Sequence, residues 1–249
     1  MAPVIETRAL FRQFGALTVA DNISFRLEAG ARHALIGPNG AGKTTFVNML
    51  TGVLAPTSGT ILLGGEDVTT SSVAARVRRG LGRTFQISSL FPSLPALDNV
   101  ALGIAERDGV SLGLWEPASQ RTSVKDEAVS ILEGLGLGVD VRTPVRDLPY
   151  GKQRLVEIAI ALALRPKVLL LDEPAAGVPS MESGRILDVL AQLPGDIAVL
   201  IIEHDMELVF RFAERITVLV QGRVLVEGTP AEIAADQGVR DVYLGASHG

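Results

Sequence analysis

The spacing at which apolar residues recur changes along the chain. "NISFRLEAGARHALIG" (22–37) alternates between apolar and polar positions, which predicts two strands joined by a turn. A glycine-rich turn at 37–42 and an amphipathic run at 43–53 predict a loop followed by a helix. "APTSGTILLGGEDV" (55–68) predicts a turn, a short strand and another turn. The first part of the chain therefore combines antiparallel strands with one strand–loop–helix unit.

Helical periods dominate the rest of the chain. We expect a basic helix at 72–80 and amphipathic helices at 92–106 and 123–136. From 151 onward helices alternate with apolar strands, which predicts a mostly parallel sheet. These helices are expected at 151–165, 180–193 and 205–213, and the strands at 167–172 and 197–203. "ITVLVQGRVLVEG" (216–228) predicts two strands around a tight turn, and the tail beyond it predicts a helix.

Composition narrows the class of protein. A chain of 249 residues with 47% hydrophobic residues suits one α/β domain with an appended subdomain, or two small domains. The net charge of −5 disfavours a protein that coats nucleic acid. The absence of cysteine excludes disulfides and thiolate metal sites, and it fits a reducing compartment.

Membrane segments are not predicted. The N-terminus has no apolar core of signal-peptide length. The most apolar runs, 156–164, 167–171 and 197–202, fall short of the roughly 20 residues that cross a bilayer. We expect a soluble chain whose membrane role, if it has one, comes through a partner.

"GPNGAGKTT" (37–45) matches the phosphate-loop pattern G-x-x-x-x-G-K-[ST]. Its glycines let successive backbone N–H groups face phosphate oxygens, and the following helix adds its positive N-terminal dipole. Lys43 supplies a charge for the β- and γ-phosphates, and Thr44 offers a hydroxyl to Mg²⁺. The alternative is a chance glycine-rich turn.

"VLLLDEP" (168–174) is a buried-strand pattern that ends in two carboxylates. Asp172 would face the magnesium shell, and Glu173 would orient or deprotonate the attacking water. The alternative is a strand end with two solvated acids.

Two further polar residues end strand-like runs. His204 follows "IAVLIIE" and would hydrogen-bond the γ-phosphate and the attacking water; otherwise it caps something local. Gln86, in "RTFQ", would reach Mg²⁺ or the water; otherwise it is a solvated glutamine. His33 and His248 have no such position and are assigned no role.

In order along the chain, Phe14, "GPNGAGKTT", Gln86, "LPYGKQR" (148–154), "VLLLDEP" and His204 resemble ATP-binding-cassette (ABC) ATPases. "LxYGxQRxxEIA", "DEPAAG", "IEHDM" and "GTPAEI…YLG" are similar to ATP-binding subunits of branched-chain amino acid importers.

The resemblance implies the fold class: an α/β, RecA-like P-loop NTPase core with an antiparallel β subdomain and an inserted helical subdomain. It implies one ABC ATPase domain over 1–249. The core and β subdomain would take 1–86 and 156–229, the helical and signature subdomain 87–155, and a C-terminal tail 230–249.

It also implies ATP and Mg²⁺ as cofactors, with two ATP molecules between two chains arranged head to tail. Phe14 would stack on adenine; otherwise it is a core phenylalanine. The phosphates would be held by Gly37, Pro38, Asn39, Gly40, Ala41, Gly42, Lys43, Thr44 and Thr45. Thr44, Gln86 and Asp172 would hold the metal, and Glu173, His204 and Gln86 would serve catalysis. Tyr150, Gly151 and Lys152 would contact the neighbour's ATP.

Two segments depart from the family's pattern. Pro149 stands where the signature serine is usual, and Tyr150 where its first glycine is usual. Pro149 offers neither a hydroxyl nor an N–H, so Gly151 and the free N–H groups of the helix start would carry the contact. Pro179 replaces the usual acid of the loop after Glu173. Both departures concern contacts across the dimer.

The resemblance implies an ATP-hydrolysing subunit that powers a membrane importer, for branched-chain or related amino acids. Its partners would be a second ABC ATPase subunit, identical or paralogous, transmembrane permease subunits, and indirectly a solute-binding protein, but no nucleic acid. It would lie at the cytoplasmic face of the membrane and dock through the helical subdomain and "ISSLFPSLPALDNV" (87–100).

Other functions remain open from the sequence. The prolines motivate a weakly hydrolysing regulatory or scaffold module. An ABC ATPase for another solute or lipid, or one acting on DNA or ribosomes, is also possible; the acidic pI near 5.3 disfavours the last.

Overall fold

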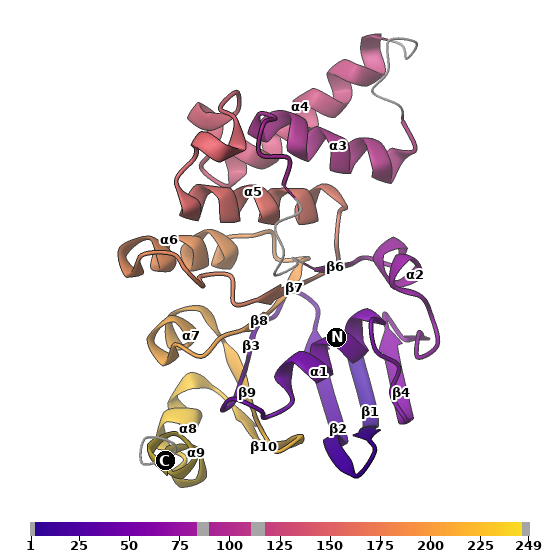
Figure 1. Ribbon diagram of the computed structural model, residues 1–249, viewed down its shortest axis with the longest axis vertical. Coiled ribbons are helices and arrows are strands. Elements are labelled where there is room, and N and C mark those ends of the chain that lie inside the picture. The colour runs from indigo at the N-terminus through magenta and orange to yellow at the C-terminus, as the bar shows by residue number, and fades with distance from the viewer. Residues whose placement is uncertain (1–2, 84–89, 111–117, 246–249) are drawn as a thin grey trace.

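The computed structural model describes residues 3–83, 90–110 and 118–245. Two sheets and a set of helices make up this part of the chain (Figure 1). Helices α3, α4 and α5 lie together at one end of the molecule, the larger sheet crosses its middle, and the smaller sheet lies at the other end beside α1. No helix in the described ranges is long and apolar enough to cross a membrane.

The larger sheet has six strands in the order β10-β9-β3-β8-β7-β6. All neighbouring pairs are parallel except β9 and β10. Its strands are β3 (Arg32–Ile36), β6 (Leu81–Arg83), β7 (Val168–Asp172), β8 (Ala198–Ile202), β9 (Arg215–Val220) and β10 (Arg223–Gly228). The apolar runs of β3, β7 and β8 are buried throughout because helices or the second sheet cover both faces. The expected mostly parallel sheet is confirmed.

The smaller sheet is antiparallel, in the order β2-β1-β4-β5. Its strands are β1 (Pro3–Phe14), β2 (Leu17–Glu28), β4 (Ser58–Leu63) and β5 (Glu66–Asp67). Although β2 and β3 are consecutive, they belong to different sheets, so the turn between them passes from one layer to the other. Strand β1 was not predicted. Register shifts and a positive φ of 48° at Ala9 break the alternation by which a strand is recognised.

The helices are α1 (Lys43–Thr51), α2 (Val73–Arg78), α3 (Ala96–Asp108), α4 (Ala118–Gly134), α5 (Tyr150–Ala163), α6 (Ser180–Ala191), α7 (Met206–Phe212), α8 (Pro230–Ala235) and α9 (Gln237–Gly245), with 3₁₀ turns at η1 (Gly138–Asp140) and η2 (Val145–Asp147). The expected helices are present, but α4 begins five residues before its predicted start at 123, and the tail forms two helices, α8 and α9, where one was expected. The subdomain limits stay a prediction, and α5 runs through the expected boundary at 155/156.

The buried side chains form two clusters, one on each face of the large sheet. One packs α1 between this sheet and the antiparallel sheet, with Phe46, Val47 and Leu50 at its centre. The other joins the large sheet to α3, α4, α5, α6 and α7. This arrangement is the expected RecA-like core with its β and helical subdomains, and it leaves the carboxyl ends of β3, β7 and β8 at one edge.

Candidate functional site

The carboxyl ends of three parallel strands meet at one edge of the large sheet. Leu35 of β3 and Asp172 of β7 both lie opposite Ile202 of β8. The phosphate loop follows β3, Glu173 directly follows β7, and His204 is the second residue after β8. Ligands of open α/β sheets bind at such an edge. The topology thus gathers residues that are far apart in the sequence.

The phosphate loop turns sharply between β3 and α1. Gly40 and Gly42 adopt positive φ angles of 78° and 99°, which favour glycine. A Cβ atom on Gly42 would lie only 2.6 Å from the carbonyl oxygen of Val19. Glycine is therefore required at position 42 both by conformation and by space.

Lys43 lies half-buried at the first turn of α1. Its Nζ donates to the carbonyl oxygens of Gly37 at 2.6 Å and Pro38 at 3.0 Å. Burial lowers the pKa of Lys43, and the nearby carboxylates of Glu173 and Asp172 oppose that effect. The ammonium group thus lies on the loop itself, close to both acids, where a bound phosphate would meet it.

Asp172 carries a buried oxygen that fits a metal ligand. Its Oδ2 has no hydrogen-bond partner within the described residues, and Arg83 Nη2 lies 3.6 Å away. Burial raises the pKa of Asp172, while Arg83 opposes the rise. Mg²⁺ prefers oxygen ligands and keeps several from phosphate or water. This carboxylate and the exposed hydroxyl of Thr44 suit a magnesium ion bound together with nucleotide phosphates.

No group of three histidine, cysteine, aspartate or glutamate side chains forms a metal cluster in the part of the chain that the structure covers. A magnesium ion held by one carboxylate, one hydroxyl and phosphates does not require such a cluster.

Glu173 and His204 face each other across the edge. His204 Nδ1 lies 3.4 Å from Glu173 Oε1, and both side chains are accessible to solvent. Glu173 has a φ of 48°, an uncommon conformation for a non-glycine residue. Such strain is often found at functional sites, and here it aims the first residue after β7 toward His204.

Glu203 lies directly behind this pair and was not foreseen. It is 2% exposed, and its carboxylate accepts the backbone N–H groups of Ala175 and His204 at 3.4 and 3.3 Å. Burial raises the pKa of Glu203. The signal in the sequence was an acid that ends the apolar run "IAVLII". Arg83, which pairs with Asp172, was also missed; its signal was a cation three residues before Gln86.

Phe14 ends β1, where the β1–β2 turn begins, and its ring is 47% exposed. The Arg12 guanidinium covers one face at 4.4 Å from the ring centre. The same hairpin brings Val19 against Gly42 of the phosphate loop. The exposed ring and this proximity support adenine stacking, which stays a prediction.

The signature residues begin α5. Pro149 is its N-cap, Tyr150 is 44% exposed, and Gly151 is buried. Lys152 Nζ donates to Asp140 at 2.7 Å. Contact of Tyr150, Gly151 and Lys152 with a neighbour's ATP stays a prediction. Gln86 lies outside the described residues, and its role also stays a prediction.

Comparison with known proteins identifies the family to which the chain is similar. The family described as "ABC transporter" matches residues 20–176, and one described as "Branched-chain amino acid ATP-binding cassette transporter" matches residues 223–249. The high-affinity branched-chain amino acid transport ATP-binding protein LivG of Salmonella typhimurium is 37% identical over 252 residues, which cover 98% of each chain.

Solved structures agree in fold. The ADP conformation of an ATP-binding cassette of an ABC transporter has a TM-score of 0.85 at 27% identity and covers 98% of this chain and all of its own. A dimeric post-hydrolysis state of another ATP-binding cassette, bound to ADP and Pi, has a TM-score of 0.73 at 25% identity and covers 91% of this chain and 98% of its own. The phosphate loop, the acidic pair and these matches lead to one conclusion: the chain belongs to the ABC transporter family and is one of its ATP-binding, ATP-hydrolysing subunits.

Proposed function

We propose that this chain hydrolyses ATP to power a membrane importer for branched-chain or related amino acids. The observation that carries the ATPase is the sheet edge at which Lys43, Asp172, Glu173 and His204 meet. The solute class is supported by the likeness to LivG and by the match of the C-terminal segment to branched-chain amino acid cassettes.

The chain's own residues have separate roles in this proposal. Lys43 moves from the loop carbonyls to the β- and γ-phosphates, where its charge offsets theirs. Thr44 and Asp172 would hold a magnesium ion, which would neutralise charge on the phosphates. Glu173 orients the attacking water or accepts its proton. His204, whose Nδ1 lies 3.4 Å from Glu173 Oε1, would donate a hydrogen bond to the γ-phosphate or to that water.

A second ABC ATPase subunit completes the site. At the start of α5 the N–H of Lys152 already donates to the Pro149 carbonyl, and Pro149 makes no side-chain cap, so the N–H groups of Tyr150 and Gly151 have no partner within the helix. In a head-to-tail dimer these groups would face the γ-phosphate bound to the other chain. Permease subunits would hold the pair at the cytoplasmic face of the membrane.

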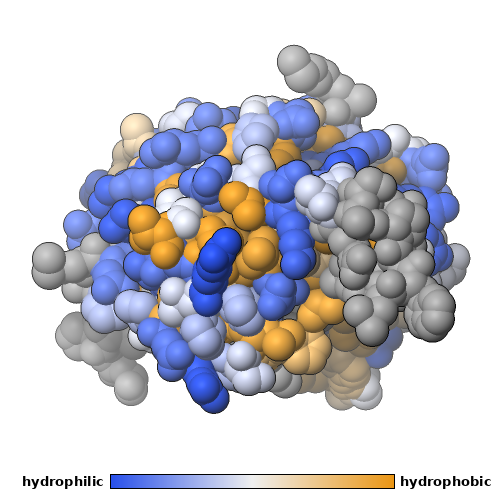
Figure 2. All heavy atoms as spheres, turned by 90° about the horizontal axis from the view of Figure 1, so that it is seen from above, coloured by the Kyte–Doolittle hydropathy of each residue, from blue (hydrophilic) through white to orange (hydrophobic). Residues whose placement is uncertain are grey.

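The permease would dock at the helical end of the molecule. Figure 2, which looks onto that end, shows apolar side chains grouped among hydrophilic ones. Phe91, just before α3, is 55% exposed. Leu94 is half-buried, and its carbonyl accepts the N–H of Val145, so it belongs partly to the fold. Phe91 is therefore the better candidate of the two for docking.

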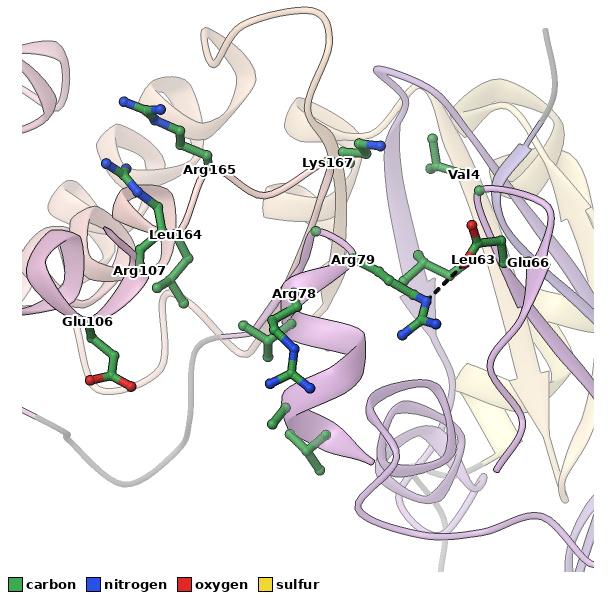
Figure 3. A pocket seen from close by; sticks show the side chains of 15 residues that line it. Val4, Leu63, Glu66, Arg78, Arg79, Glu106, Arg107, Leu164, Arg165 and Lys167 are labelled. Carbon is green, nitrogen blue, oxygen red and sulfur yellow. Dashed lines mark hydrogen bonds and ion pairs between the residues drawn. The ribbon is translucent and has the colours of Figure 1, made fainter. Parts of the chain in front are cut away.

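A basic groove beside α2 is a second candidate docking surface. It lies between α2, the ends of α3 and α5 and the β4–β5 turn, and encloses about 940 Å³ (Figure 3). None of its lining residues belongs to the predicted nucleotide site. Five of them are cationic and two are acidic, in a chain of net charge −5; the cations are Arg78, Arg79, Arg107, Arg165 and Lys167. Arg79, Arg107 and Arg165 already pair with acids of this chain. An acidic cytoplasmic segment of the permease would therefore suit the groove chiefly through Arg78 and Lys167.

Turnover of wild type and Glu173→Gln, measured with permease and binding protein in proteoliposomes, tests the proposal. We expect the variant to bind ATP and to lose about a hundredfold or more in phosphate release. Glu207→Gln, at an exposed position of α7, is the control and should match wild type. Leucine-stimulated ATP turnover and leucine uptake would support the solute class. A wild type as slow as Glu173→Gln would contradict the ATPase.

The weakly hydrolysing module gains no support from the structure. Pro149 and Pro179, which motivated it, have φ angles of −53° and −54°, close to those that proline prefers, so neither distorts its helix.

A further inference from the structure

Two helices at the edge of the site begin in the same way. The N-cap prolines of α5 and α6 have nearly the same conformation, with ψ angles of 149° at Pro149 and 141° at Pro179. Each proline's carbonyl accepts N–H groups three and four residues further on: Lys152 and Gln153 for α5, and Glu182 and Ser183 for α6, at 2.8–3.1 Å. The two departures from the family pattern are thus a matched pair.

Tyr150 touches the loop that leads into the second of these helices. A Cβ atom on Gly177 would lie 3.2 Å from Tyr150 Cε1 and 3.6 Å from its Cζ and Oη. The ring therefore packs directly on the Gly177 backbone, which has a φ of 75°. Arg154 lies 5.1 Å from the ring centre and is held by Glu157 at 2.7 Å. The tyrosine is thus fixed by its own chain.

The next residue strengthens the same contact. A Cβ atom on Gly151 would lie 3.4 Å from Val178 Cγ1 and 2.6 Å from Glu182 Oε2. The start of α5 thus packs closely on the loop and on the first turn of α6.

The loop is in turn tied to the catalytic acid. The N–H of Ala176 donates to the carbonyl of Glu173 at 3.0 Å, and the N–H of Val178 donates to the carbonyl of Ala175 at 3.2 Å. A short hydrogen-bonded segment therefore runs from Glu173 to the contact with Tyr150.

We infer that Tyr150 is a positioning residue that fastens the start of α5 to the loop 175–179 and so links it to Glu173. This rests on the proposed function, since the start of α5 is where the other chain's ATP would bind. Closure on that ATP would then shift Glu173 of the same chain, which acts on its own ATP. Tyr150 acts through Gly177 and not by touching nucleotide.

Steady-state kinetics of the assembled transporter distinguish a Tyr150 that positions Glu173 from a Tyr150 that contacts nucleotide directly. Tyr150→Ala is expected to lower kcat about tenfold or more with little change in KM for ATP, because a loosened contact misplaces the acid. Tyr150→Phe keeps the ring and should match wild type. A raised KM with unchanged kcat would overturn the inference, because it would show direct nucleotide contact.

A double-mutant cycle tests the contact itself. Gly177→Ala adds a methyl group 3.2 Å from Tyr150 Cε1 and should lower kcat more in the wild-type chain than in the Tyr150→Ala chain. Equal losses of kcat in both chains would show that the contact between Tyr150 and Gly177 does not affect turnover.

Hydrogen exchange of the isolated chain tests the contact independently of activity. Tyr150→Ala should speed exchange at the amides of 175–178 and leave those of 37–45 unchanged, while Tyr150→Phe should match wild type throughout. Unchanged exchange at 175–178 would overturn the inference. If wild type does not hydrolyse ATP, the proposed function fails, and this measurement still decides whether Tyr150 holds the loop.

Discussion

Gly151 lies where a side chain would meet Glu182 of its own chain, at the helix start that we propose contacts a neighbour's nucleotide. The nearby Glu182 Oε2 is the end of a flexible, exposed side chain, which can move aside for a methyl group. An aspartate at 151 would instead set two carboxylates together, beside the place expected for the γ-phosphate. Its effect would therefore have two causes.

We expect Gly151→Ala to fold normally and Gly151→Asp to lose both thermal stability and ATP turnover. Adding Glu182→Gln to the aspartate variant should restore the melting temperature but not turnover, because only the contact within the chain is relieved. Thermal unfolding and phosphate release measure the two effects. Turnover regained in the double variant would show that the aspartate acts within its own chain alone.

Pro149 also has a testable role at this scale. Since it caps α5 without strain and offers no donor, Pro149→Ser should leave turnover unchanged or raise it. Steady-state turnover of this variant beside wild type gives the answer, and a clear loss would mean that the proline is needed.

At the scale of single elements, Arg76 fixes the C-terminal end of α1. It is 1% exposed, and its Nη1 donates to the carbonyls of Met49 and Leu50 at 2.6 and 2.7 Å, at the end of the helix that follows the phosphate loop. Its other nitrogens donate to the carbonyls of Thr69 and Ser71. One buried cation thus satisfies carbonyls from two segments.

Arg76→Leu should lower the free energy of unfolding by about 3 kcal/mol or more, because buried carbonyls lose their donors. Urea unfolding measures this change. Arg78→Leu, on an exposed position of the same helix, is the matched control and should change stability little. Similar losses in both variants would contradict a special role for Arg76.

His33 makes the stability of the large sheet depend on pH. Its Nε2 donates to Thr217 Oγ1 at 2.8 Å, and that hydroxyl donates to Glu227 at 3.0 Å. Burial lowers the pKa of His33 from 6.5 to about 4; Glu227 opposes the shift and Arg215 adds to it. The unfolded chain therefore binds more protons between these values, so the contribution of His33 is full above pH 6.5 and is lost as the pH falls toward 4.

We expect wild type to lose up to about 3 kcal/mol of unfolding free energy from this group between pH 6.5 and 4. His33→Gln retains a donor for Thr217 and does not titrate, so the variant should show a smaller loss over the same range. Urea unfolding of both proteins across the range gives the difference. Parallel profiles would mean that His33 titrates normally.

At the scale of the whole molecule, the helical end and the basic groove beside α2 should bind the permease. Phe91→Asp and Arg78→Glu should each weaken co-purification with the permease without changing ATP affinity, because one removes an exposed apolar contact and the other reverses a charge of the groove. Leu225→Asp changes an exposed apolar residue of β10 and serves as the control. Unchanged assembly in both docking variants would refute this surface.

The elements of the fold that show a regular apolar period could be predicted from the sequence. The elements that depend on how strands pair could not. The parallel strands and their helices follow from apolar runs and helical periods, and they are confirmed. Strand β1 escaped notice because its bulges break the alternation. The exchange of layers between β2 and β3 also escaped notice, because a turn in sequence does not say which sheet its strands join.

The sequence by itself determined the chemistry of this protein. The phosphate loop and the acidic pair are local patterns, in which a short stretch of backbone supplies most of the geometry, so Lys43, Asp172 and Glu173 were found without the fold. Only the tertiary structure decided what supports them: Arg83 beside Asp172, Glu203 behind His204, and Tyr150 on Gly177. Most of these contacts join residues on different elements. Which side chains meet depends on how the strands and helices pack, and no local sequence pattern specifies that packing.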